Sequence, residues 1–120
     1  QSDLLELITQ TLEGNLADME VAFSQDHVAT VVAASKGYPG IYEKGVSIHG
    51  LSAIEDSIVF HAGTRYEDDE FKTNGGRVLC ITSSSDTLGT ALKTSYRNLN
   101  RLCYSGIYFR HDIGKDLLDQ

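Results

Sequence analysis

Two glycine-bearing stretches with basic residues are the segments of this 120-residue sequence best suited to chemistry. The first is SKGYPG at residues 35–40, in which Lys36 precedes a glycine and the single proline of the chain follows. The second is TNGGRV at residues 73–78, in which Arg77 comes directly after two glycines. Glycine lets backbone N–H groups approach a ligand, and lysine or arginine supplies positive charge to a phosphate or carboxylate. Both stretches therefore have the composition of an anion site.

Both stretches also have a purely structural interpretation. Pro39 fixes φ, and the glycines around it permit a tight turn after a buried strand. Asn74-Gly75 is a strong hairpin-turn signal and can also mark a bulge. The residues alone leave the anion site and the turn as open alternatives.

The remaining reactive side chains give weaker signals. His61 lies between the apolar IVF and the small residues of AGT, a setting typical of a core or rim histidine. The sequence contains no phosphate loop of the G-x-x-x-x-G-K-[ST] type, no G-x-G-x-x-G turn and no nucleophile elbow. The four histidines are widely spread and neither cysteine has a C-x-x-C partner, so no metal site is expected in this chain. Cys80 and Cys103 are expected to be free thiols.

Charge and length limit the class of protein. The chain has 17 acidic and 10 basic residues, a net charge of −7 that argues against nonspecific binding of nucleic acid. Its length suits one domain or one domain with an appendage. No apolar run approaches a membrane span and no signal-peptide pattern opens the chain, so the sequence predicts a cytoplasmic protein.

The first quarter of the chain has the pattern of helix. Asp3 and Glu6 form a capping box, and Gly14 is a stop signal. A second short helical piece is predicted over residues 16–23. The apolar positions of one helical face are Leu4, Leu5, Ile8 and Leu12.

From residue 27 onward the sequence predicts a small α+β unit, a β-rich lobe of short antiparallel strands backed by one helix. The helix is predicted over residues 86–102, with Asp86 as its N-cap and the basic residues Lys93, Arg97 and Arg101 on its solvent face. The acidic residues 66–70 are expected to form a solvated loop, residues 71–73 to pair back onto the sheet, and the tail at 116–120 to fray. Strands are expected at residues 28–34, 44–50, 57–63, 77–82 and 106–112.

Four segments in one order resemble a known family. They are SKGYPG-x-Y-x-KG, VFHAGT, TNGGRVLCIT and YFRHDIG. Together they resemble the C-terminal domain of glycinamide ribonucleotide synthetase (phosphoribosylamine–glycine ligase), an ATP-grasp enzyme of purine biosynthesis. The resemblance runs through nearly the whole chain. It implies that residues 1–26 end an ATP-grasp domain with its terminal helix and that residues 27–120 form the C-terminal lobe, a rudimentary single-hybrid-like fold.

The resemblance also implies an activity. The family joins 5-phosphoribosylamine and glycine through glycyl phosphate, using ATP and magnesium, with manganese as an alternative metal. The nucleotide and metal are held mainly by the upstream domain, which is missing here, so no catalytic or metal-binding residue is expected in this chain and the fragment alone is expected to be inactive. The implied partners are the rest of the polypeptide and the small-molecule substrates. In some eukaryotes the synthetase is fused to further purine-pathway enzymes, so a multifunctional protein is possible by resemblance.

The lobe is expected to line the active-site cleft with its glycine-bearing loops. If so, Lys36 and Arg77 converge on one concave surface. In the alternative, a structural module supports the ATP-grasp domain or an oligomer, and these two side chains point apart or pair with acidic neighbours. A third alternative, an independent binding barrel, requires a closed apolar pocket. The expected substrate-binding residues are Lys36, Gly37, Tyr38, Gly40, His61, Thr64, Gly75, Gly76 and Arg77.

Overall fold

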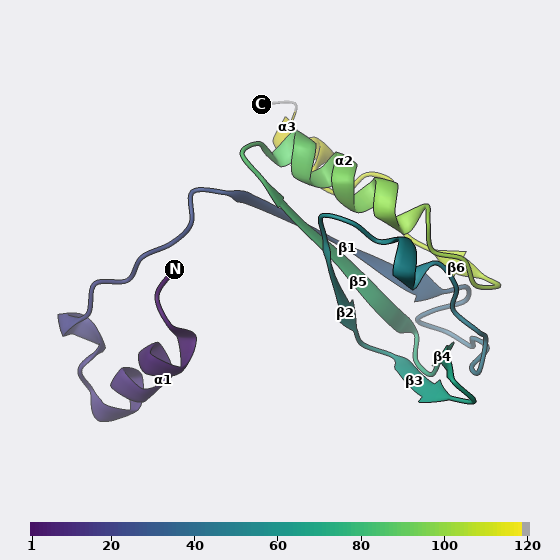
Figure 1. The fold of residues 1–120 in the computed structure, drawn as a ribbon, viewed down its shortest axis with the longest axis horizontal. Helices are drawn as coiled ribbons and strands as arrows, with labels where there is room; N and C mark the ends of the chain where they lie inside the picture. Colours follow the sequence, from purple (N-terminus) through teal and green to yellow (C-terminus); the bar gives the residue numbers. More distant parts are fainter. Residues whose placement is uncertain (119–120) are drawn as a thin grey trace.

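A four-stranded antiparallel sheet forms the centre of the lobe in the computed structural model, which describes residues 1–118 (Figure 1). Its strands are β1 (His27–Ser35), β2 (Ile58–His61), β5 (Arg77–Ser85) and β6 (Ile107–Tyr108), in the order β2-β5-β1-β6. The two long strands, β1 and β5, make the longest pairing of the sheet. The predicted strands 28–34 and 77–82 are confirmed, while those at 57–63 and 106–112 form only over the shorter spans of β2 and β6.

Helix α2 (Leu88–Leu99) covers one face of the sheet and packs against β1 and β5. Thr87, rather than the predicted Asp86, is its N-cap, because the Thr87 side chain accepts a hydrogen bond from the Thr90 N–H. The helix ends three residues before the predicted bound. Its buried side chain Leu99 belongs to the same core cluster as the sheet residues Val31, Ala33, Leu79 and Ile81.

A β-hairpin extends from the lower end of the sheet (Figure 1). It consists of β3 (Thr64–Glu67) and β4 (Glu70–Thr73), joined at Asp68 and Asp69. Both aspartates have positive φ, 54° and 59°, as a two-residue hairpin turn requires. The predicted solvated loop at 66–70 is therefore wrong, whereas the pairing of 71–73 occurs within β4.

The predicted strand at 44–50 is also wrong. This segment makes only isolated bridges, from Ser47 to Lys72 and from His49 to Cys103. A left-handed Gly45, with φ 81°, interrupts the extended backbone that its alternating pattern indicated. The short 3-10 turn η2 (Leu51–Ala53) follows.

The N-terminal segment stands apart from the lobe (Figure 1). Helix α1 (Leu4–Glu13) begins as predicted, with the Asp3 carboxylate accepting from the Glu6 N–H at 2.9 Å, and ends at a left-handed Gly14. The predicted second helical piece is reduced to the 3-10 turn η1 (Leu16–Asp18). No residue of 1–26 is buried, so α1 has no core of its own.

The C-terminal segment adds a short helix, α3 (Lys115–Leu118), where a frayed tail was predicted; residues 119 and 120 of that tail lie outside the described part of the chain. Within residues 1–118, none of the helices is both long and apolar enough to cross a membrane.

Candidate functional site

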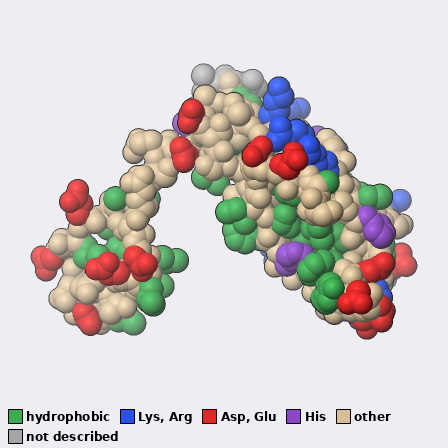
Figure 2. All heavy atoms as spheres, viewed as in Figure 1, with side chains coloured by type: hydrophobic (Ala, Val, Ile, Leu, Met, Phe, Trp, Pro, Cys, Tyr) green, Lys and Arg blue, Asp and Glu red, His purple; other side chains and the backbone are tan. Residues whose placement is uncertain are grey.

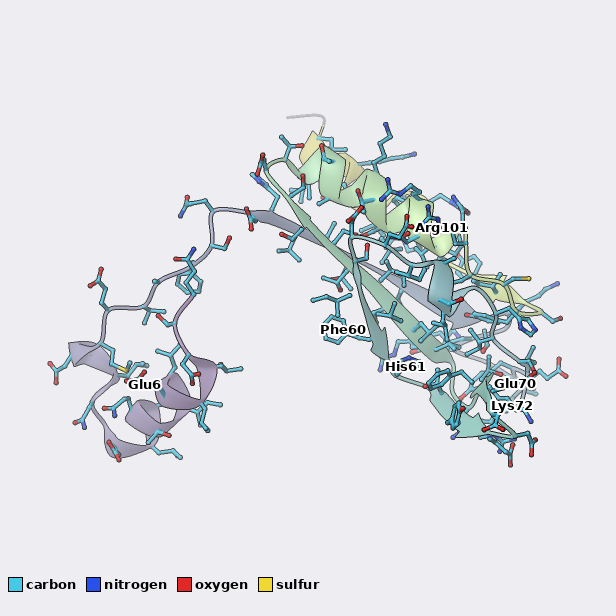
Figure 3. The ribbon with its side chains drawn as sticks, viewed as in Figure 1. Glu6, Phe60, His61, Glu70, Lys72 and Arg101 are labelled. Atoms are coloured by element: carbon cyan, nitrogen blue, oxygen red, sulfur yellow. The ribbon has the colours of Figure 1, made fainter. Side chains whose placement is uncertain are left out.

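The face of the sheet opposite α2 is open and largely apolar. The pairing register places alternate residues of each strand on this face, among them Val32 of β1, Phe60 of β2 and Tyr108 of β6. Phe60 and Tyr108 are 52% and 58% exposed, far more than the core residues on the other face. Hydrophobic side chains gather along β2, where Phe60 is labelled (Figures 2 and 3).

A β-bulge in β5 brings Arg77 to this open face. Leu79 pairs with Ala33 and Arg77 pairs with Ala34, so Val78 is an extra residue in the strand. Val78 and Leu79 are both fully buried, as expected where two consecutive residues oppose one residue of the partner strand. Without the bulge, strict alternation would put Arg77 in the row of Leu79 and Ile81, beneath α2.

Arg77 lines a hollow of about 520 Å³ on this face, here called the Arg77 hollow. Three segments that are far apart in the sequence meet there: the turn after β1, the link from β2 to β3, and the start of β5. Three of the expected site residues, Tyr38, Gly76 and Arg77, are therefore brought together. The full lining is Val32, Tyr38, Ala62, Gly63, Gly76, Arg77 and Cys80.

The glycines at this hollow have a definite packing role. A Cβ atom on Gly63 would lie 2.6 Å from the Arg77 carbonyl oxygen and 2.7 Å from the Gly75 Cα, so the two backbones touch without room for a side chain. A Cβ atom on Gly76 would overlap the ring of Tyr38, lying 2.7 Å from its Cε2. The structural interpretation of TNGGRV thus holds for its glycines.

Gly37 and Gly40 lie in the turn after β1, away from the lining of the Arg77 hollow. Gly37 has φ 98°, and a Cβ atom there would collide with the Ile41 carbonyl. A Cβ atom on Gly40 would lie 3.2 Å from the Gly37 carbonyl oxygen. These two glycines therefore form the turn itself, which also contains the cis peptide bond between Tyr38 and Pro39.

Lys36 does not join Arg77. It lines a separate hollow of about 190 Å³ with Glu43, Ser105 and other residues, because its backbone N–H bonds to the Gly106 carbonyl at 2.7 Å and directs it toward the loop before β6. The expectation that Lys36 and Arg77 share one concave surface is wrong. Among the described residues neither side chain has an ion-pair partner, so they do not pair with acidic neighbours either.

His61 and Thr64 form their own contact beside the hollow. The His61 Nδ1 lies 2.9 Å from the Thr64 Oγ1, and the His61 ring packs against Phe71 at a centroid distance of 4.5 Å. His61 follows Phe60 in β2 and pairs with Leu79, so it faces away from the open side of the sheet. The structure therefore gives His61 the position of a rim residue (Figure 3).

Two further basic side chains near the sheet, Arg110 and Lys72, are paired with carboxylates. Arg110 makes two hydrogen bonds to the Asp112 carboxylate, at 2.9 and 2.8 Å, and this pairing holds the pKa of Asp112 below its usual range. On the hairpin, the hydrogen bond from Lys72 to Asp68 lowers the pKa of Asp68 and raises that of Lys72. Arg77 is thus a cation without a carboxylate partner among residues 1–118, placed at an open hollow.

The solvent-facing position of the basic residues Arg97 and Arg101 of α2 is confirmed, and so is the free state of the two thiols. Arg97 and Arg101 pair at the surface with Asp56 and Glu55, at 3.4 and 2.9 Å. Both cysteines are free, and Cys80 is half-buried in the wall of the Arg77 hollow.

The sequence model of the family described as "Phosphoribosylglycinamide synthetase, C domain" matches residues 28–116. The chain belongs to this family. The match covers β2, β5, β6 and α2, and all of β1 except its first residue. The motifs that meet at the Arg77 hollow all lie inside it.

Relatives named phosphoribosylamine–glycine ligase are similar over nearly the whole chain. The protein of Caldanaerobacter subterraneus is 41% identical over 94% of this chain, and that of Halalkalibacterium halodurans is 44% identical over 95%. The chain spans only 27% and 26% of their lengths. A bifunctional purine biosynthetic protein of Dictyostelium discoideum is 42% identical over 99% of the chain, which spans 15% of its length.

A solved structure shows the same fold. The crystal structure of phosphoribosylamine–glycine ligase from Thermotoga maritima matches with a TM-score of 0.74 and 31% identity, over 88% of this chain and 27% of that one. The predicted α+β lobe is confirmed by this match and by the antiparallel sheet. The C domain of this family is therefore the architecture that positions the Arg77 hollow.

Sequence reasoning missed Cys80, which lines the Arg77 hollow, and Ser35, which bonds to the Gly75-Gly76 segment next to it. Cys80 lies on the open face because it alternates with the buried Leu79 and Ile81, whereas the apolar run VLCIT indicated only a free thiol. Ser35 lies in the first glycine motif but was not selected; the structure shows it holding the neighbouring loop through its side chain. Among residues 1–118 there is no group of three or more His, Cys, Asp or Glu side chains suited to a metal ion.

Proposed function

We propose that the chain is the C-terminal part of an ATP-dependent ligase that joins 5-phosphoribosylamine and glycine, through glycyl phosphate, to give glycinamide ribonucleotide in purine biosynthesis. The lobe would line one side of the active-site cleft. The observation that carries this proposal is Arg77, an unpaired guanidinium at a hollow where three family motifs meet. A guanidinium held in place stabilises the charge that develops on phosphoryl oxygens.

We infer a division of labour within the longer polypeptide. Residues 1–26 would end the ATP-grasp domain, and residues 27–120 would form the lobe; the family match, which starts at residue 28, supports this boundary. ATP and its magnesium, or manganese, would bind mainly upstream, in keeping with an Arg77 hollow whose lining contains no carboxylate. The chain would then contribute substrate contacts and no catalytic group, would act in the cytoplasm, and would be inactive alone.

The experiment is a comparison of two substitutions in the full-length enzyme, Arg77→Ala and Lys36→Ala. Arg77→Ala should lower kcat/KM for one phosphate-bearing substrate by about tenfold or more, a loss of roughly 1.4 kcal/mol in transition-state stabilisation. Its melting temperature should stay unchanged because the Arg77 side chain is exposed. Lys36→Ala should have a smaller effect, since Lys36 lies in another hollow.

A second candidate function is a structural module that supports the ATP-grasp domain or an oligomer. The packing of Gly63 against Gly75 favours it, since that contact needs glycine for backbone reasons alone. Unchanged kinetics in Arg77→Ala, or a loss of activity that only follows a loss of stability, would establish this candidate and reject the active-site lobe.

A further inference from the structure

Ser35, the last residue of β1, joins the two glycine-bearing loops. Its backbone N–H donates to the Gly76 carbonyl at 2.8 Å, and its hydroxyl donates to the Gly75 carbonyl at 3.1 Å. Ser35 is only 6% exposed, so these bonds are sheltered from water. A single residue thus fixes two successive carbonyls of the segment that leads into Arg77.

Tyr38 holds the same segment from the side of the hollow. Its ring lies against the Gly76 backbone so closely that a Cβ atom on Gly76 would overlap it. Its own backbone N–H bonds to the Ser35 carbonyl at 3.1 Å, which turns the chain so that the ring reaches Gly76. Ser35 and Tyr38 therefore both contact the short Gly75-Gly76 segment.

We propose that Ser35 and Tyr38 are positioning residues, which fix the Gly75-Gly76 segment so that the Arg77 guanidinium is held at a bound anionic substrate. This inference rests on the function proposed above and adds to it how the arginine is preorganised. The Arg77 side chain has no partner among the described residues, so the backbone beneath it is what limits its range. Errors of about 1 Å in the placement of a charged group are enough to reduce catalysis substantially.

The first test is a double-mutant cycle in the full-length enzyme with Ser35→Ala and Arg77→Ala. We expect Ser35→Ala alone to lower kcat/KM for the substrate that Arg77→Ala affects, by about three- to tenfold, with the other substrates unaffected. In the Arg77→Ala background the same change should cost less than about twofold, because the group that it positions is absent. Ser47→Ala, which removes one hydrogen bond to Glu70 on the hairpin, is the matched control and should leave kcat/KM unchanged.

The second test changes the packing of the Tyr38 ring against Gly76. Gly76→Ala must displace Tyr38, so it should impair the same substrate as Tyr38→Ala does, whereas Tyr38→Phe, which keeps the ring, should retain more activity than either. Combining Gly76→Ala with Tyr38→Ala should be no worse than Tyr38→Ala alone, since the overlap is then gone. The Tyr38 and Gly76 variants still test the proposal if Ser35→Ala fails to fold.

The outcomes separate this proposal from the one it rests on. If Arg77→Ala leaves the kinetics unchanged, the proposed function is wrong and the positioning role falls with it. If Arg77→Ala impairs the enzyme but Ser35→Ala and Gly76→Ala add their full losses to it, only the positioning role is overturned. Losses that follow melting temperature and affect all substrates alike would likewise overturn it.

Discussion

At the scale of single residues, the glycines of the motifs differ in what they do. Gly63 and Gly75 are required because two backbones meet there, and Gly76 is required because an aromatic ring lies on it. Gly89 in α2 has no such neighbour; a Cβ atom there would meet only Leu118 Cδ2, at 3.8 Å, an ordinary contact. The same residue type is thus essential for packing at one position and replaceable at another.

We expect Gly63→Ala to lower the free energy of unfolding by about 1–3 kcal/mol, the usual cost of overpacking. Gly89→Ala should instead raise it, by at most about 1 kcal/mol, because alanine favours helix over glycine. Urea unfolding of the two variants beside the parent chain measures both. Equal effects from the two substitutions would contradict the packing role of Gly63.

The meeting of the two glycine-bearing motifs could be predicted from the sequence, but the side of the sheet on which each cation lies could not. We expected the motifs SKGYPG and TNGGRV to lie together, and one hollow is lined by Tyr38 of the first and by Gly76 and Arg77 of the second. The side on which Arg77 lies depends on the bulge at Val78, and no residue in RVLCIT signals an extra position in the strand. Lys36 was placed with Arg77 because both are cations next to glycine, whereas its backbone bond to Gly106 sends it elsewhere.

At the scale of elements, strands β1 and β5 and helix α2 could be predicted because long, regular apolar patterns are the strongest local signal. The hairpin β3–β4 could not, since Glu67 to Glu70 reads as an acidic, solvated segment. What makes it a hairpin is backbone conformation at Asp68 and Asp69, together with pairing across to Thr73 and its neighbours. Residues 44–50 show the opposite error, in which alternation indicated a strand that found no continuous partner.

The hairpin turn gives a prediction for a matched pair of substitutions at Asp69. Both Asp69→Gly and Asp69→Val remove the 3.5 Å contact from the Tyr66 hydroxyl, so the loss of that contact does not distinguish them. Glycine tolerates φ of 59° and valine does not, so Asp69→Gly should be more stable by about 1–2 kcal/mol. Thermal unfolding of the two variants measures this difference in stability. Equal stability would mean that the turn adopts another conformation.

At the scale of the whole molecule, residues 1–26 are separate from the lobe. The segment is closed on itself by hydrogen bonds between Ser2 and Ala22, at 3.1 and 2.8 Å, and none of its residues is buried. Leu5 and Leu12, on the apolar stripe of α1, are 73% and 84% exposed. The chain spans about a quarter of the length of the ligases it resembles, and this stripe and the open sheet face are exposed apolar surfaces in the described part of it.

Deleting residues 1–25 should therefore leave the melting temperature of the lobe within about 1 °C of the parent chain, as expected for a segment without buried contacts. Asp26 is retained because its carboxylate accepts from the Ser84 hydroxyl at 3.4 Å. Calorimetry on the two chains is the measurement. A fall of several degrees would show that α1 supports the lobe and would move the domain boundary.

The meeting of Gly63 with Gly75 has a consequence for how genomes are interpreted. Because this contact constrains backbone alone, natural selection would keep both glycines in any descendant that keeps the fold, including one whose enzymatic activity has decayed. A motif search built on HAGT and NGG would then recover active and inactive copies alike. Arg77, whose side chain is exposed and has no ion-pair partner among residues 1–118, carries no such constraint from the fold.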